Sequence, residues 1–479
     1  MQYHGYFIVI SSAIIQCVAV GLLFSMGLFV VPLEVTFGID RYLASLFPSI
    51  CMSTAFLSSL LAGFLQDRLS DHGLRVSYVF ILGGLSIGVG MIGCSYAQTI
   101  YVVLMFATLI GIGVGFTGFS IAGVCVRWFH KHRSFALLLA MSGSGTGNFV
   151  CPLIIQALLD LFHRGENDCN SDSVIQSAAC KEWRNVMRIV GFISMIILMF
   201  TSILMRLPQE GEVEEYESRM SKGDHSRPTS RDDSYTIRNE QLDDHAEISN
   251  VSDSASYFQS DEQALDTVST DIPQLSIKQT CSSKTFILLA AYEIAFSFGY
   301  SNYFVHVQAF SESVGLSSSV GAMALSMTGV AMLFGNFTLG YISGIFGSIR
   351  TLQITMALQM ISIIIWPHCT SEWSLLLVSF LYGYNAIALP SLPLAILSNS
   401  FDKTSRPYMM TIFGIIQASQ TPGALVGPAI VSLLYDKQNN YNAGAAFTAG
   451  VMFIGNIAIS FLPSPEAQFQ SLLVQHRHV

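Results

Sequence analysis

Charged side chains are scarce in this sequence. Asp, Glu, Lys and Arg make up 11% of its 479 residues, whereas soluble proteins usually carry about 25%. Hydrophobic residues make up 51%. A chain this apolar cannot hide its surface in a water-soluble core, so the composition excludes an ordinary soluble protein and favours one whose solvent is a lipid bilayer.

Signatures of several other functional classes are missing as well. None of the nine cysteines forms a C-x-x-C pair, so a zinc or thioredoxin-type site has no support. The net charge of −9 comes from residues 207–283, which hold 17 acidic and 6 basic side chains. The rest of the chain is +2 and has no basic stripe for nucleic acid. We therefore expect no cofactor, no metal and no nucleic-acid partner.

Two glycine-rich patterns look like nucleotide-binding loops but lack the required context. Residues 113–118 fit G-x-G-x-x-G, and residues 143–147 read Gly-Ser-Gly-Thr-Gly. Neither follows a strand within a βαβ unit, which the dinucleotide-binding interpretation requires. Both lie in apolar stretches, where small residues let helices approach closely, so we expect helix packing instead.

Apolar stretches long enough to cross a bilayer recur along the chain. A span needs about 20 mostly apolar residues to cross roughly 30 Å of hydrocarbon, and in lipid its backbone groups must be bonded internally, which favours helices. The first stretch is too long for the apolar core of a removable signal peptide. The sequence predicts an all-α membrane protein with 12 transmembrane helices in two six-helix bundles, at residues 6–31, 44–66, 76–96, 99–124, 134–161, 184–206, 284–309, 318–345, 350–368, 373–398, 408–434 and 441–462.

A polar insert divides the two sets of six. It is rich in Ser, Asp, Glu and Gln and cannot bury enough apolar surface to offset the entropy of ordering, so we predict a disordered acidic cytoplasmic loop. A plain linker and a phosphorylated segment that binds cytoplasmic regulators are both open. The predicted domains are a first bundle at 1–206, the loop at 207–283, a second bundle at 284–462 and a cytoplasmic tail at 463–479.

The distribution of Lys and Arg over the short loops predicts the orientation. Basic residues are in excess on the side that would carry both termini, which places both termini and the insert in the cytoplasm of a multi-pass protein. A plasma membrane is favoured over an organelle membrane. Cys169 and Cys180 share one loop on the opposite side, where a disulfide is one of two alternatives. The loops on the cytoplasmic side hold Arg68, Arg75, Arg127, Lys131, Arg133, Arg350, Lys403 and Arg406, and the opposite loops hold Arg41, Arg164, Lys181, Arg184 and Lys437.

An acid and several bases cluster where the second span meets the third. The stretch from Gly63 to Asp67 and Arg68 continues to Gly73 and Arg75. At a helix end such groups can form ion pairs and helix-dipole contacts that break and reform. This stretch resembles the signature loop of the major facilitator superfamily, G-x-x-x-D-R-x-G-x-R, with about three extra residues.

The next loop carries a more specific resemblance. Residues 128–133 read Trp-Phe-His-Lys-His-Arg, and small residues follow at Ala136, Ala140, Gly143 and Gly147. The pattern is similar to a segment of the monocarboxylate transporter family, as are Trp183-Arg184 and the later Gly427-Pro428. This resemblance implies two six-helix bundles around a central cavity that work by alternating access. Gating is assigned to Asp67, Arg68, Arg75, Arg127 and Arg133; the alternative is a set of positive-inside loops with no gating role.

Three positions depart from what the resemblance implies for the solute. The proton-linked lactate carriers of that family are expected to have a Lys in the first span and an Asp/Arg pair in the eighth. Phe24, Met332 and Asn336 stand at those positions. A carboxylate would lose its charge-assisted partner there, which argues against simple proton–lactate symport.

Polar side chains recur near the middle of several predicted spans, which is the depth of transporter binding sites. Prolines near that depth in the tenth and eleventh spans, Pro390, Pro393 and Pro422, weaken those helices beside it. Each polar residue alone could equally form an interhelical hydrogen bond. The predicted substrate-binding residues are Gln16, Asn148, Glu293, Asn302, Asn336, Asn385 and Gln417.

Glu293 is the notable ionisable residue within a span. Burial favours the neutral form of a carboxyl, so Glu293 is a candidate proton carrier; a structural hydrogen bond to a neighbouring helix is the alternative. His306 lies about 20 Å further along and about 140° around the same helix. Because an enzyme needs converging acid and base groups, we expect no enzymatic activity.

We therefore predict a secondary-active transmembrane symporter or carrier. Its partners would be the lipid bilayer, a small organic solute and, as one option, protons. The solute would be monocarboxylate-like or another small metabolite. Two alternatives remain open: a carrier of neutral or zwitterionic solutes such as amino acids, and a non-transporting nutrient receptor built on a transporter fold.

Overall fold

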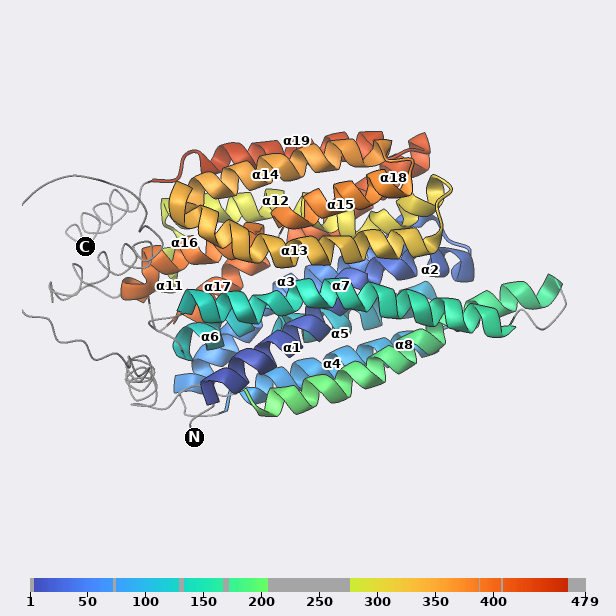
Figure 1. Ribbon diagram of the computed structural model, residues 1–479. Coiled ribbons are helices and arrows are strands. Elements are labelled where there is room, and N and C mark those ends of the chain that lie inside the picture. Colours follow the sequence, from blue (N-terminus) through green and yellow to red (C-terminus); the bar gives the residue numbers. More distant parts are fainter. Residues whose placement is uncertain are drawn as a thin grey trace, which may run out of the picture.

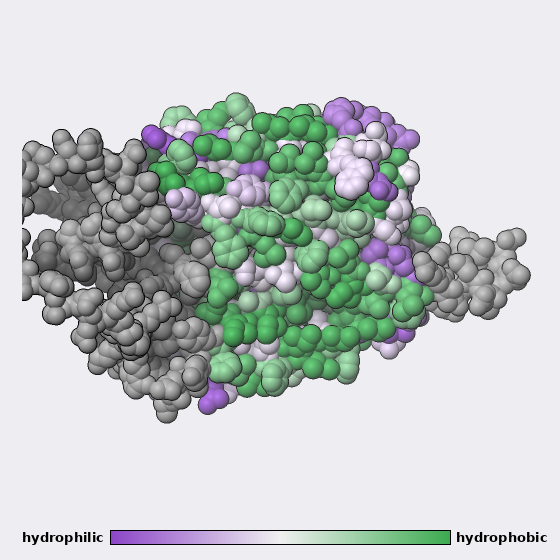
Figure 2. All heavy atoms as spheres, viewed as in Figure 1, coloured by the Kyte–Doolittle hydropathy of each residue, from purple (hydrophilic) through white to green (hydrophobic). Residues whose placement is uncertain are grey.

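The computed structural model describes residues 4–71, 75–128, 133–166, 172–205, 276–386, 388–405 and 408–463. Every regular element within these ranges is a helix. The long helices run side by side, and exposed apolar side chains form a broad band over them, with hydrophilic residues gathered toward the ends of the bundle (Figure 1 and Figure 2). This distribution fits helices that cross a hydrocarbon layer.

The first half of the fold runs from α1 to α8. α1, a short 3₁₀ segment and α2 follow one another directly and form one candidate span, Phe7–Phe37. The elements are α1 (His4–Ser25), η1 (Met26–Phe29), α2 (Val30–Phe37), α3 (Arg41–Asp71), α4 (Ser77–Tyr96), α5 (Ile100–Thr117), α6 (Ile121–Trp128), α7 (Arg133–Glu166) and α8 (Asp172–Ile203).

The first long helix of the second half, α12, begins at Lys284, and a short helix, α11, precedes it. Ser276 and Gln279 form a capping box, in which each side chain bonds the other residue's backbone N–H, and this starts α11. The elements are α11 (Ile277–Cys281), α12 (Lys284–Ser313), α13 (Ser318–Phe346), α14 (Ser348–Ile365), η2 (Trp366–His368), α15 (Glu372–Ala386), α16 (Ala388–Ser405), α17 (Met409–Ala418), α18 (Thr421–Gln438) and α19 (Asn442–Ile459).

The predicted all-α fold is confirmed, and each of the twelve predicted spans coincides with one helix or with consecutive helices. Nine helices in the described ranges are long and apolar enough to cross a membrane. The other three predicted spans are α12, α15 with α16, and α17 with α18. α12 carries Lys284, Glu293 and His306, and the span of α17 with α18 is divided by a break just before Pro422. Residue 387, between α15 and α16, lies outside the described part of the chain.

The connection between the fifth and sixth spans differs from the predicted long loop. α7 extends to Glu166 and α8 begins at Asp172, so most of that connection is helical. Cys169 and the side chain of Cys180 lie outside the described part of the chain.

Small residues pack α7 directly on α1. A Cβ atom added to Gly143 or Gly147 would collide with the backbone carbonyl of Ala13 or Cys17. The glycines that look like a nucleotide loop in the sequence therefore bring two helix backbones into contact. This packing fixes α1, and with it Gln16, inside the first half.

The close approach of α7 to α1 predicts that Gly147 cannot be replaced by a larger residue without loss of stability. Gly147→Ala should destabilise the protein by about 1–3 kcal/mol, because the methyl group overpacks against a backbone that cannot swing away. The unfolding midpoint in detergent measures this. Gly450→Ala is the matched control, since a Cβ there meets nothing within 4 Å. Equal midpoints for the two variants would contradict the contact.

Candidate functional site

The two halves meet along two pairs of long helices. α3 of the first half packs against α17 and α18, and α7 packs against α13. The second pair lies side by side near the centre of the view (Figure 1). Polar contacts cross this boundary at both ends and in the middle, and they define the candidate site.

One polar contact lies at the end of the bundle where α3 finishes. The carboxylate of Asp67 accepts hydrogen bonds from the backbone N–H of Thr411, at 2.8 Å, and from its hydroxyl, at 2.7 Å. Asp67 is only 4% exposed. Because α17 begins at Met409, the Thr411 N–H is one of the donors left free at a helix start, where a negative charge is favoured. We call this contact the Asp67 latch.

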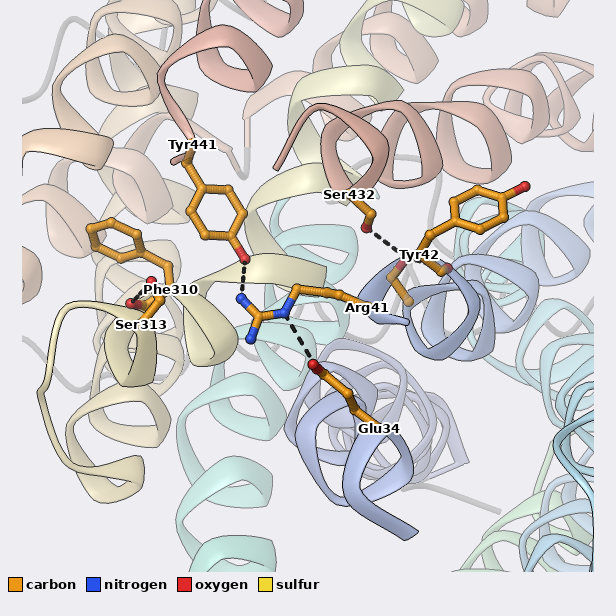
Figure 3. Close-up of polar contacts among 8 residues, drawn as sticks. Glu34, Arg41, Tyr42, Phe310, Ser313, Ser432 and Tyr441 are labelled. Carbon is orange, nitrogen blue, oxygen red and sulfur yellow. Dashed lines mark hydrogen bonds and ion pairs between the residues drawn. The ribbon is translucent and has the colours of Figure 1, made fainter. Parts of the chain in front are cut away.

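Another contact spans the boundary at the opposite end. Arg41, the first residue of α3, bonds Glu34 of α2 at 3.3 Å and donates to the hydroxyl of Tyr441 at 3.3 Å. Its guanidinium also lies 4.5 Å from the ring centre of Tyr435. Figure 3 shows Arg41 between the first-half carboxylate and the second-half phenol. We call these four residues the Arg41 latch.

A third contact joins the halves at mid-depth. The side-chain amide of Asn148 on α7 donates to the hydroxyl of Thr328 on α13 at 2.6 Å. The same nitrogen lies 3.9 Å from the sulfur of Met332. Among the described residues, the amide oxygen of Asn148 has no hydrogen-bond partner. Asn148 is thus the predicted binding residue that bonds directly across the boundary, and it keeps one acceptor unused.

Two other predicted binding residues bond within their own halves. Gln16 donates to the carbonyl of Gly118 at 2.9 Å, which ties α1 to the end of α5. Asn302 donates to the hydroxyl of Thr448 at 2.7 Å, which ties α12 to α19. Both side chains are buried. In this conformation these bonds serve helix packing.

Three further predicted residues lie on α13, α15 and α17. Asn336 is buried on α13. Asn385 of α15 donates to the carbonyl of Leu381 at 2.8 Å. Gln417 accepts from Gln420 across the break between α17 and α18. A polar pair therefore accompanies this helix break, as in transporter sites built from interrupted helices.

Glu293 lies level with the break between α17 and α18. Ser297 on α12 packs against Gly423 at the start of α18, where any Cβ would collide with the serine hydroxyl. Glu293 is one helical turn before Ser297 on the same face, so it faces the residues just ahead of α18. It is 1% exposed, and within the described ranges its Oε2 atom has no partner.

Aromatic rings occupy the boundary where the resemblance implies a lysine. Phe24 of α1 stacks on Phe304 of α12 with ring centres 4.4 Å apart and meets the edge of Tyr300 at 5.3 Å. A Cβ on Gly27 would collide with the carbonyl of Phe304, so η1 and α12 are in backbone contact. The halves are closed here by apolar packing.

The sequence and structure comparisons identify the family. A family model described as Major Facilitator Superfamily matches residues 11–230 and 287–473. The chain belongs to the major facilitator superfamily. Human monocarboxylate transporter 7 is 21% identical over 99% of this chain and 88% of its own, and Xenopus laevis monocarboxylate transporter 12 is 23% identical over 84% and 77%.

Solved structures of superfamily transporters share the fold at low sequence identity. A bacterial homolog of the human lysosomal transporter Spinster, in an inward-facing and occupied conformation, has a TM-score of 0.63 at 14% identity and covers 98% of each chain. The E. coli fucose:proton symporter has a TM-score of 0.59 at 15% identity and covers 97% of this chain and 100% of its own.

The superfamily loop contributes one residue to a latch. Asp67 bonds the second half, as described above, while Arg68 lies against the ring of Phe64 at 5.5 Å and Arg75 is exposed. The side chains of Arg127 and Arg133 lie outside the described part of the chain. The residue pattern of the superfamily loop therefore singles out Asp67. No local sequence pattern singles out Arg41 as a latch residue, because its partner Tyr441 is 400 residues away.

A small cavity lies between the halves close to the Asp67 latch. It holds about 10 Å³ and is lined by Gln66 and Ser59 of α3, Ser120, and Phe413 and Gly414 of α17. This is room for about one water molecule. The amide nitrogen of Gln66 is buried without a partner among the described residues, so a water there would satisfy it. The two halves of the superfamily fold are thus packed together at this end of the bundle.

Weakening the Arg41 latch should shift the protein measurably toward conformations that are open at the Arg41 end. Arg41→Gln removes an ion pair and weakens the bond to Tyr441, and bonds to charged groups contribute about 1.5–3 kcal/mol. The variant should open the Arg41 end more often, which distances between spin labels on the two halves would report. Tyr441→Phe should have the same direction of effect.

Lys437→Gln is the matched control, because it removes a neighbouring exposed charge outside the latch. Distance distributions that change equally in Arg41→Gln and Lys437→Gln would mean that the latch does not hold the halves together. Asp67→Asn should favour opening at the other end, and opening at the same end as Arg41→Gln would also contradict the assignment.

Proposed function

We propose that this protein is a secondary-active transporter that moves a small organic solute across a membrane by alternating access. The observation that carries the proposal is the pair of latches at opposite ends of one boundary, Asp67 with Thr411 and Arg41 with Tyr441. Alternating access requires each end to close and open in turn around a central site. A boundary held by separable polar contacts at each end supports this mechanism.

The chemistry of the latches suits repeated opening. Across the boundary, Asp67 bonds a helix start and Arg41 bonds a phenol, while Glu34 pairs with Arg41 within the first half. Opening either end therefore exposes polar groups that water can solvate at the membrane surface. The middle of the boundary is closed by Phe24 against Phe304 and by Asn148 against Thr328. Solute entry would separate these mid-depth contacts while one latch stays closed.

The boundary supports a solute of low charge. Phe24 and Met332, which stand where the resemblance implies Lys and Asp, both contact the opposite half. A strongly anionic solute would lack a charge partner among these side chains. We infer a neutral, zwitterionic or weakly anionic metabolite, and the names of the relatives make a monocarboxylate the first candidate to test.

Glu293 is the proposed proton carrier. It is buried on α12, one helical turn before Ser297, which packs against Gly423 at the start of α18. A carboxyl there can hold a proton while the halves are packed and release it when water enters. The likeness to the fucose:proton symporter shows the fold, and the proton coupling proposed here depends on Glu293 itself.

The proposed domain boundaries, orientation and location are those that the sequence predicts. We propose six-helix bundles at 1–206 and 284–462, with the loop 207–283, the tail 463–479 and both termini in the cytoplasm. A plasma membrane is the proposed location. Regulators that bind the acidic loop would act on the Asp67 end, because that loop connects α8 to the start of the second half.

Solute counterflow tests the proposed function. Purified protein in liposomes preloaded with one unlabelled solute should accumulate the same radiolabelled solute, in a screen of carboxylates, amino acids and vitamins. Locking the boundary by a cysteine crosslink between the halves should abolish the accumulation. Saturable binding with no exchange across the whole screen would instead identify a receptor on a transporter fold.

The role of Glu293 predicts a pH effect. In wild-type liposomes, uptake should rise with an inward proton gradient, and Glu293→Gln should remove that dependence while solute exchange without a gradient continues. Glu312→Gln is the control on the same helix. Wild-type pH dependence in the Glu293→Gln variant would remove Glu293 from the coupling mechanism.

A further inference from the structure

A cavity of about 300 Å³ lies within the second half, away from the boundary between the halves. Its lining comes from α12, α13, α14, α16 and the residues that follow α19. All of these belong to one half, so the cavity is separate from the candidate transport site. It lies at the Asp67 end of the bundle, where α12 and α14 begin.

One side of the cavity is electropositive. Gly347 adopts a φ of +84°, which ends α13 and lets α14 start at Ser348. In the described structure no side chain caps the start of α14, so its first N–H groups keep their positive partial charge. Arg350, the third residue of α14, lines the same cavity and is exposed. A helix start and a guanidinium therefore face one space.

A buried hydroxyl is an independent sign of a ligand. Thr285, the second residue of α12, lines the cavity and is 2% exposed. Within the described ranges its Oγ1 atom has no hydrogen-bond partner, although an unpaired buried polar group costs about 1–3 kcal/mol. Ser400 of α16 also lines the cavity and adds a further hydroxyl.

The remaining walls are apolar. Phe346, Ile349, Ile396, Leu462 and Pro463 line the cavity between these polar groups. The cavity lies at the ends of membrane-spanning helices, which is the depth of lipid headgroups. A ligand that fits would combine a compact anion with several acceptor oxygens and an apolar portion.

We propose that this cavity binds a phosphate group, supplied either by an anionic phospholipid or by a soluble phosphate. The phosphate accepts hydrogen bonds from the start of α14, from the Arg350 guanidinium and from the Thr285 hydroxyl. In the lipid case the glycerol and the first acyl carbons lie against Phe346 and Ile396. The site is independent of the proposed transport function, because it requires no movement of the two halves.

Lipid retention tests the site in the full-length protein. Wild type is reconstituted in nanodiscs of phosphatidylcholine with and without phosphatidylglycerol, and native mass spectrometry counts the phosphatidylglycerol that stays bound. Arg350→Gln and Thr285→Val should each bind it about tenfold more weakly. Arg75→Gln is the control, since it removes an exposed positive charge at the same end of the other half.

A second arm distinguishes the source of the phosphate. Inorganic phosphate is added to lipid-free protein in detergent at constant ionic strength, and the unfolding midpoint is measured. A rise that Arg350→Gln removes, without selective retention of phosphatidylglycerol, supports the site with a soluble ligand. Arg350→Lys and Thr285→Ser should retain most of the binding, which separates ligand loss from misfolding.

The proposal is overturned by either of two results. One is that folded Arg350→Gln and Thr285→Val proteins bind phosphatidylglycerol and inorganic phosphate as the wild type does. The other is that Arg75→Gln lowers binding as much as Arg350→Gln, because this would indicate general attraction to positive charge rather than a built site.

Discussion

A charged side chain that leaves water must find partners, and in this protein two such groups find them across the boundary between the halves. Asp67 reaches the start of α17, and Arg41 reaches Tyr441. The other contacts described here across the boundary, from Phe24 on Phe304 to Asn148 on Thr328, join neutral side chains. The position of the two halves therefore depends on a few strong contacts at the membrane surfaces and on weaker packing between them.

The fold was largely predictable because lipid imposes one rule on the backbone. Every N–H and C=O in hydrocarbon must be bonded within its own segment, so apolar length alone predicts helices, and all twelve predicted spans coincide with helices. The break between α17 and α18 followed from Pro422. The short helix α11 was not predicted, because its capping box is a local signal inside a segment with a disordered composition.

For the candidate site, the sequence indicates which polar residues lie within spans but not which way their side chains face. Hydropathy shows that Gln16, Asn148 and Asn302 lie near mid-span, yet only the structure shows that the first and third bond within their own halves. Which way a helix face turns depends on packing against distant segments, such as the glycine contacts that hold α7 on α1. Asp67 could be singled out from the sequence because it belongs to a local motif. The role of Arg41 could not, because its contact is with Tyr441, 400 positions away.

Several buried acceptors have no hydrogen-bond partner among the described residues. Asn148, Asn302 and Asn385 each donate through the amide nitrogen, while each amide oxygen is unpaired among the described residues, as is Oε2 of Glu293. Each such buried acceptor costs about 1–3 kcal/mol, which donors from water or a solute would offset. A solute that brings hydroxyl or ammonium donors can satisfy these oxygens, whereas one that brings only carboxylate oxygens cannot.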